Sequence, residues 1–175
     1  MGVACGRLDP IACAWGKPLF LRFSEQNVQL EPLSVHLELV VGSFPLHRNT
    51  SEILATLNQD FQQGGPSRQI IKGFALQAEA GKEALLAWDL PAVGKAMDHC
   101  QFLYESFRFP ALQAPGLLQA VRVLRNHGAL GAKFSGAGGE GSVIGLYTPG
   151  ADSNAGVMAL QNLGLDAFVM SLFFQ

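Results

Sequence analysis

The chain is poor in charged residues. Asp, Glu, Lys and Arg make up 15% of its 175 residues, whereas globular domains usually carry about a quarter. The net charge is only −2, so we expect neither nucleic acid nor an anionic membrane surface as a partner. With a hydrophobic fraction of 49%, the composition predicts either a large core or a surface that something else covers.

Long apolar runs and a cysteine framework are also missing. No apolar run reaches the roughly 18 residues of a membrane-spanning helix, and Arg7 and Asp9 interrupt the stretch where a secretory signal would need its apolar region. The three cysteines include no C-x-x-C pair, which is typical of reduced thiols in an intracellular protein. We therefore expect a cytoplasmic location. The sequence also contains no metal-site spacing and no G-x-S-x-G hydrolase motif.

Glycine, by contrast, is concentrated in the stretch GAKFSGAGGEGSVIGLY, residues 131–147. Such a backbone can adopt positive φ and point successive N–H groups at an anion; a glycine-rich β-hairpin turn explains the stretch equally well. A G-x-G-x-x-G pattern begins at Gly136, but a dinucleotide site needs a helix after it. Here residues 142–147 read as a strand that ends at a Thr-Pro-Gly turn, so we reject the dinucleotide interpretation.

This stretch resembles the third conserved motif of the GHMP kinases, which include galactokinase, homoserine kinase, mevalonate kinase and phosphomevalonate kinase. In that family the motif is a glycine-rich loop between two strands of the C-terminal domain, and it lies against the active site. The lysine, the hydroxyl residue and the glycines stand in the family's order. The resemblance implies a substrate or phosphate-loop role for Lys133, Ser135, Gly136, Ala137, Gly138, Gly139 and Gly141. Lys133 also fits a simple strand-edge charge.

Asp9 allows two interpretations. A carboxylate before a proline is typical of a helix N-cap. The segment Gly-Arg-Leu-Asp at residues 6–9 also resembles the G-x-x-D segment near the middle of GHMP kinases, although Pro10 replaces the polar residue common there. The resemblance implies that Asp9 is the catalytic base, which takes the acceptor hydroxyl's proton as the phosphoryl group arrives. We prefer this interpretation and take Arg7 as a further candidate.

Arg48 and Thr50 match an x-R-x-T pattern that precedes a helix in mevalonate kinase-like members. The resemblance makes Arg48 a candidate phosphate contact, and a structural role near the helix cap is at least as well supported.

The rest of the pattern predicts an α+β fold, an antiparallel sheet with helices packed on one face. This agrees with the ferredoxin-like C-terminal domain of the GHMP kinases. We expect residues 1–34 to be a remnant of the central catalytic-Asp segment with a hairpin, and residues 35–175 to be the C-terminal domain. The predicted strands are 17–23, 28–30, 35–41 and 166–174 with two around the glycine loop, and the predicted helices are 51–61, 68–87, 89–107, 116–127 and 154–163.

The family's N-terminal nucleotide loop, a Pro-x3-Gly-Leu-Gly-Ser-Ser-type segment, and its magnesium-binding Ser and Glu have no counterpart in this sequence. The resemblance implies ATP and Mg2+ as cofactors, a sugar or mevalonate-like acceptor, and an N-terminal domain or a homodimer as partner. We expect weak or no kinase activity from this chain alone, because phosphoryl transfer depends on phosphate-binding groups and metal. The alternatives are a non-catalytic binding or pairing module derived from a GHMP kinase, and a generic ferredoxin-like interaction module.

Overall fold

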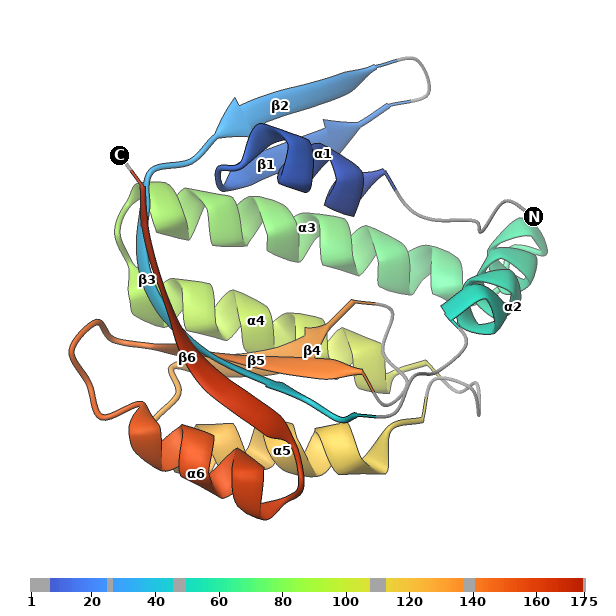
Figure 1. The fold of residues 1–175 in the computed structure, drawn as a ribbon. Coiled ribbons are helices and arrows are strands. Elements are labelled where there is room, and N and C mark those ends of the chain that lie inside the picture. Colours follow the sequence, from blue (N-terminus) through green and yellow to red (C-terminus); the bar gives the residue numbers. More distant parts are fainter. Residues whose placement is uncertain (1–6, 25–26, 46–49, 108–112, 137–140, 175) are drawn as a thin grey trace.

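The computed structural model describes residues 7–24, 27–45, 50–107, 113–136 and 141–174. Its centre is a four-stranded sheet with the order β4-β5-β3-β6, in which every neighbouring pair is antiparallel (Figure 1). The strands are β3 (Val35–Ser43), β4 (Gly131–Ser135), β5 (Ser142–Tyr147) and β6 (Asp166–Phe174). The predicted α+β class with an antiparallel sheet is confirmed, and β4 and β6 form the two edges.

Helices α5 (Pro115–Asn126) and α6 (Asn154–Asn162) form the predicted layer on one face of the sheet. The main core lies between them and the sheet, where Leu117, Leu124 and Leu160 are fully buried against Val143 and Tyr147 of β5. Between those two, on the same face of β5, stands Gly145, and a side chain there would meet Leu124. Alternate residues of β5 therefore face α5, as the two-residue period of a strand requires.

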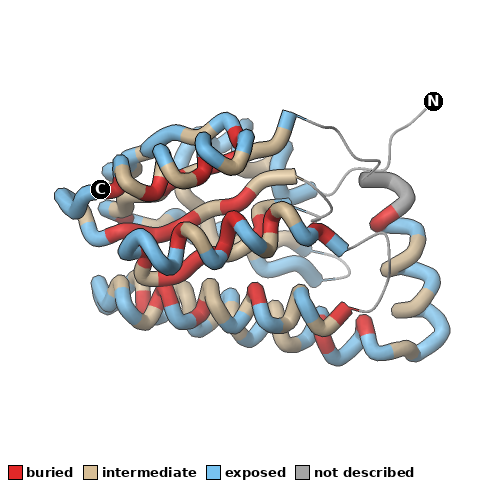
Figure 2. Tube along the Cα trace, turned by 90° about the horizontal axis from the view of Figure 1, so that it is seen from below, coloured by how far each residue is buried: buried red, intermediate tan, exposed pale blue. Residues whose placement is uncertain are grey.

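A second helical layer lies against the opposite face of the sheet. Helices α3 (Ser67–Leu86) and α4 (Leu90–Glu105) pack side by side, and α4 runs along β4. Leu146 of β5 is buried there against Val93 and Ala84. Helix α4 begins as predicted, because the Asp89 carboxylate accepts a hydrogen bond from the Ala92 N–H at 3.0 Å. Figure 2 shows the buried residues on the inner sides of these layers.

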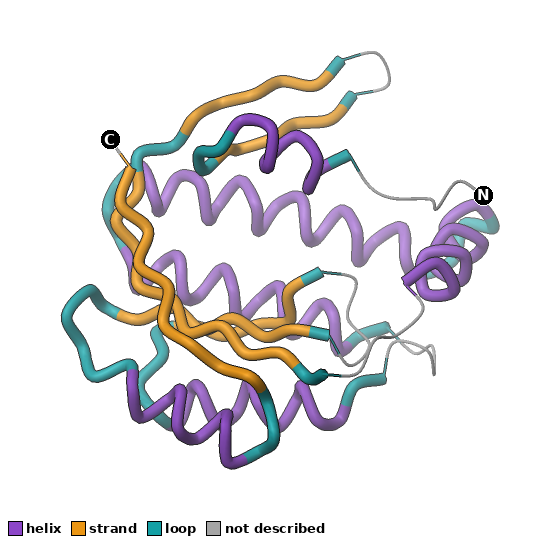
Figure 3. Tube along the Cα trace, viewed as in Figure 1, coloured by secondary structure: helices purple, strands orange, loops and turns teal. Residues whose placement is uncertain are grey.

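The predicted hairpin forms a separate two-stranded sheet of β1 (Leu19–Phe23) and β2 (Val28–Pro32). It lies on the far side of α3 from the main sheet (Figure 3). Two ion pairs tie it to α3, one between Arg22 and Glu79 at 2.5 Å and one between Lys82 and Glu31 at 2.7 Å. Because these pairs are exposed or partly exposed, each adds little to stability.

The first helix, α1 (Leu8–Trp15), lies beside the hairpin and has no buried residue. Leu8 is 55% exposed and Trp15 is 50% exposed. The N-cap interpretation of Asp9 is wrong: the helix begins at Leu8, Arg7 is its N-cap, and no side chain caps it. Asp9 instead lies in the first turn, where a carboxylate is favoured by the positive end of the helix dipole. Helix α2 (Thr50–Gln62) completes the described helices, none of which is long and apolar enough to cross a bilayer.

Candidate functional site

The glycine loop leaves β4 and returns into β5, so the predicted strand–loop–strand arrangement is confirmed. The two strands pair up to Ser135 and Ser142. Gly136 has a φ of 80°, which a residue with a Cβ rarely adopts. At the other end of the loop, the Gly141 carbonyl accepts a hydrogen bond from the Phe44 N–H at 3.3 Å. Ala137, Gly138 and Gly139 lie outside the described residues.

Two side chains of α4 accept hydrogen bonds from backbone N–H groups at the open edge of β4. The Asp98 carboxylate accepts a hydrogen bond from the Ala132 N–H at 3.0 Å, and the Gln101 side-chain oxygen accepts one from the Phe134 N–H at 3.0 Å. Residues three apart share a face of a helix, and residues two apart share a side of a strand, so the two contacts match in spacing. An edge strand normally leaves such N–H groups unpaired. Asp98 and Gln101 therefore hold the strand that leads into the loop.

Further contacts hold these two side chains in place. Gln101 is only 4% exposed, and its amide nitrogen donates to the Glu105 carboxylate at 3.0 Å. Asp98 forms an ion pair with Arg125 of α5 at 3.2 Å. No role was predicted for Asp98 or Gln101 from sequence patterns. The signal available was a pair of hydrogen-bonding residues three apart on one face of α4.

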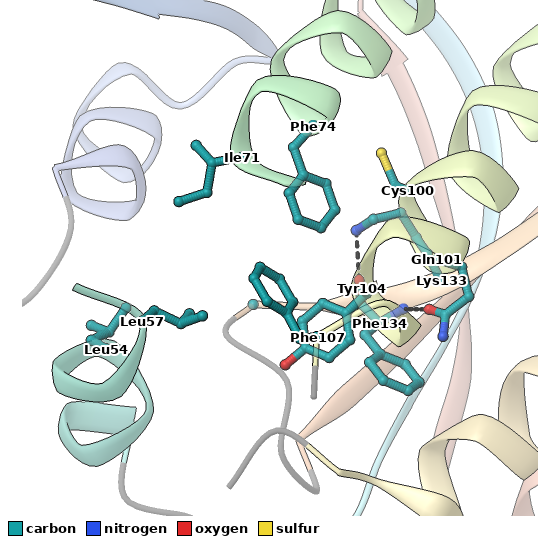
Figure 4. Close-up of a pocket in the computed structure, with 11 residues that line it drawn as sticks. Leu54, Leu57, Ile71, Phe74, Cys100, Gln101, Tyr104, Phe107, Lys133 and Phe134 are labelled. Carbon is teal, nitrogen blue, oxygen red and sulfur yellow. Dashed lines mark hydrogen bonds between the residues drawn. The ribbon is translucent and has the colours of Figure 1, made fainter. Parts of the chain in front are cut away.

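Between the two satisfied N–H groups, Lys133 extends into a cavity of about 320 Å³ beneath α2, α3 and α4 (Figure 4). Its Nζ donates to the Phe134 carbonyl at 2.5 Å. Burial lowers the pKa of the Lys133 ammonium, and the nearby Cys100 thiol partly offsets this by raising it. Burial also raises the pKa of Cys100, which Lys133 partly offsets. The cavity is lined by Leu54, Leu57, Ile71, Phe74, Cys100, Gln101, Tyr104, Phe107, Lys133, Phe134 and Gly136.

The structure brings together two of the predicted site residues, Lys133 and Gly136, which line the same cavity. Ser135 is partly buried at the end of β4 and does not line it. Asp9 and Arg7 lie at the exposed start of α1, where the Arg7 guanidinium stands over the Phe23 ring at 5.2 Å from its centroid. Arg48 lies outside the described residues. Across the part of the chain that is described, no three His, Cys, Asp or Glu residues are grouped to hold a metal ion.

Comparison with known proteins agrees with this geometry. Residues 82–164, which run from α3 through α4, α5, the glycine-loop strands and α6, match the family model "GHMP kinases C terminal". This part of the chain is therefore similar to a GHMP kinase C-terminal domain. The matched range contains every residue that lines the cavity from α4 and β4.

The proteins that are similar to this chain include mevalonate kinases. The mevalonate kinase of Aeropyrum pernix is 28% identical over 166 residues, which cover 94% of this chain and 50% of the relative. The structure of L. major mevalonate kinase in complex with R-mevalonate superposes with a TM-score of 0.79 at 23% identity, over 93% of this chain and 50% of that one.

A third similar structure is Streptococcus pneumoniae phosphomevalonate kinase in complex with phosphomevalonate and AMPPNP. It superposes with a TM-score of 0.72 at 15% identity, over 85% of this chain and 44% of that one. At these identities the two structures support the fold alone. The chain thus spans about half the length of the relatives it matches.

Proposed function

We propose that the chain supplies the C-terminal half of an ATP-dependent kinase that phosphorylates a hydroxyl group of a small molecule. The observation that carries this proposal is the strand–glycine loop–strand unit of β4 and β5, which lies within the matched GHMP kinase C-terminal domain. The similarity to the mevalonate kinase of Aeropyrum pernix supports a mevalonate-like acceptor, with a sugar as the other acceptor that the family resemblance implies. The same resemblance supports residues 1–34 as the segment that carries the base, residues 35–175 as the domain that carries the loop, and a cytoplasmic location.

Asp9 acts as the base in this proposal. Its carboxylate is exposed at the start of α1, so an acceptor hydroxyl can reach it. The glycine loop, with Ser135 and Lys133 at its base, lies on the phosphate side, where backbone N–H groups and an ammonium stabilise the charge of the transferred group. Arg7 and Arg48 are further phosphate contacts. ATP supplies the phosphoryl group. The described residues offer no grouped carboxylates for Mg2+, so no role here depends on a metal that this chain holds.

The exposed surface of helix α1 supports a second function, as a non-catalytic module that pairs with another domain or with a second copy of the chain. Helix α1 buries none of its residues, and the large side chains of Leu8 and Trp15 are about half exposed. Apolar side chains that stay in water beside a binding segment are typical of a surface that a partner covers.

The kinase proposal is tested with the chain alone and with the chain mixed with the N-terminal half of the Aeropyrum pernix mevalonate kinase. We expect the isolated chain to bind Mg·ATP weakly or not at all in a calorimetric titration. We expect the mixture to release ADP when mevalonate or a sugar is added. Asp9→Asn should lower the ADP-release rate about 10²–10⁴-fold, the usual contribution of a general base.

The matched control is Asp152→Asn, which changes another exposed carboxylate, in the turn after β5. Its rate should stay at the wild-type level. Absence of ADP release with every acceptor, together with stable association of the two halves, would support the pairing module instead. Full activity of Asp9→Asn would remove Asp9 from the catalytic role.

A further inference from the structure

The cavity beneath α2, α3 and α4 has preformed apolar walls. Its apolar lining includes Leu54 and Leu57 of α2, Ile71 and Phe74 of α3, and Phe107, which packs against Leu57 and Phe74 (Figure 4). Leu54 is 36% exposed and Ile71 is 41% exposed, so water covers apolar surface that an occupant would bury. A volume of about 320 Å³ is within the range of small-molecule sites.

A cluster of aromatic rings fixes the shape of one wall. The Tyr104 ring contacts the Phe134 ring edge-on with 4.9 Å between centroids, and it contacts the Phe107 ring edge-on at 5.9 Å. The Phe107 ring in turn stacks on Phe74 at 6.3 Å. Rings packed in this way lose little further freedom when a ligand binds, which lowers the entropic cost of binding.

The charge that the described residues bring to the lining of the cavity is positive. Lys133 is the one cationic residue in its lining, and no Asp or Glu of the described residues lines it. The described part of the chain gives the ammonium a single hydrogen-bond partner, the Phe134 carbonyl. An ammonium has three N–H donors, and a buried charge is stabilised when it is paired.

We propose that this cavity binds a small amphiphilic anion, that is, a molecule with an apolar body and one carboxylate or phosphate group. The apolar body would lie against the α2 and α3 side chains, and the anionic group would pair with Lys133 Nζ. Asp9 and Ser135 do not line the cavity, so the site excludes the proposed base, but it shares Lys133 and Gly136 with the proposed phosphate loop. Gly136 does line it, so an occupant contacts the first residue of the glycine loop.

The test is calorimetric titration of the purified chain, without nucleotide, with four probes that share one alkyl chain: octanoate, octyl phosphate, octanol and octylammonium. We expect saturable binding of one or both anions, weaker binding of octanol, and none of octylammonium. The stronger of octanoate and octyl phosphate identifies the type of anionic group. Because no nucleotide is present, the titration tests binding to the cavity separately from the proposed kinase activity.

Two lysine variants test where the anion binds. Lys133→Met keeps an apolar side chain of similar length and removes the charge, so it should weaken anion binding by roughly 30-fold or more, the usual effect of removing one partner of a buried charge pair. It should leave octanol binding unchanged. Lys72→Met removes an exposed lysine of α3 that does not line the cavity, and it should bind all four probes like the wild type.

Ile71→Trp provides a second test, which remains valid even if Lys133→Met does not fold. Ile71 stands at the partly exposed side of the cavity, so a larger side chain there should fill the space and weaken every probe that binds. Absence of saturable binding of both anions to the wild type overturns the proposal. Equal binding of anions and octanol, or an equal loss in Lys72→Met, also overturns it.

Discussion

The contact between Gln101 and the β4 edge can be tested by Gln101→Leu. The wild-type side chain is 4% exposed and accepts the Phe134 N–H at 3.0 Å, and Phe134 itself is 5% exposed. Leucine fills a similar space but has no acceptor, so the substitution leaves a buried backbone donor unpaired. Such a donor costs about 1–3 kcal/mol. The Glu105 carboxylate also loses its donor, but it is exposed and takes water instead.

The loss is measured by urea denaturation followed by circular dichroism. With a slope of about 2 kcal/mol/M, a loss of about 2 kcal/mol lowers the unfolding midpoint by about 1 M urea. Gln119→Leu is the matched control, because Gln119 is exposed in the middle of α5 and leucine has a similar helix propensity. Its midpoint should stay close to wild type.

Amide hydrogen exchange gives a second, local measurement. The Phe134 amide should exchange faster in Gln101→Leu relative to the other amides of the sheet, because its acceptor is gone. The reasoning is refuted if Gln101→Leu unfolds at the same urea concentration as Gln119→Leu and the Phe134 amide keeps its protection.

Two further predictions concern packing and pH. Gly94→Ala should lower the thermal midpoint, because the new methyl group would fall 2.3 Å from the Leu130 carbonyl oxygen, and overpacking typically costs about 1–3 kcal/mol. In the control Gly81→Ala the methyl group would meet nothing closer than 3.8 Å, so the midpoint should rise. A fall of the midpoint in both variants would contradict a specific clash between Gly94 and Leu130. Burial raises the pKa of Tyr147 from 10.0 to about 12, so the neutral hydroxyl is favoured in the folded state. The contribution of Tyr147 to the free energy of unfolding is complete below pH 10 and is lost as the pH rises through about 12. Over this range the free energy of unfolding falls by up to about 1.4 kcal/mol per pH unit. Urea midpoints of Tyr147→Phe should therefore fall less than those of the wild type across this range, and parallel curves would show that another group sets the pH dependence.

Local patterns were enough to predict most of the elements. The β1–β2 hairpin follows from two apolar segments around a polar turn, and its ladder pairs Phe23 with Val28. The start of α4 follows from Asp89 before Leu90-Pro91, since a capping carboxylate and an early proline act within one turn. Asp9 also stands just before a proline, yet α1 begins at Leu8, two residues before that proline. A capping signal therefore locates a helix start only to within a residue or two.

The parts of the site that could not be predicted all depend on contacts between distant segments. Gln101 and Asp98 bind N–H groups 33 and 34 residues further along the chain, and nothing in their own neighbourhood indicates this. The cavity needs α2, α3, α4 and β4 together, and each contributes residues that read simply as core in sequence. Lys133 was predicted from the family motif, but its burial in an apolar cavity follows from α3 and α4 lying over the sheet, which the sequence did not indicate.

The glycine pair Gly94 and Gly131 places the backbone of α4 directly against the backbone of β4. A methyl group added to either residue would fall within 2.3 Å of the opposing main chain. No deformable side-chain layer separates helix and strand at this point, and Asp98 and Gln101 fasten the same two elements further along. We therefore expect α4 and β4 to move together as one rigid unit. Gly136, with its φ of 80°, is the first residue beyond this firmly held strand, so the position at which the glycine loop begins is fixed by α4.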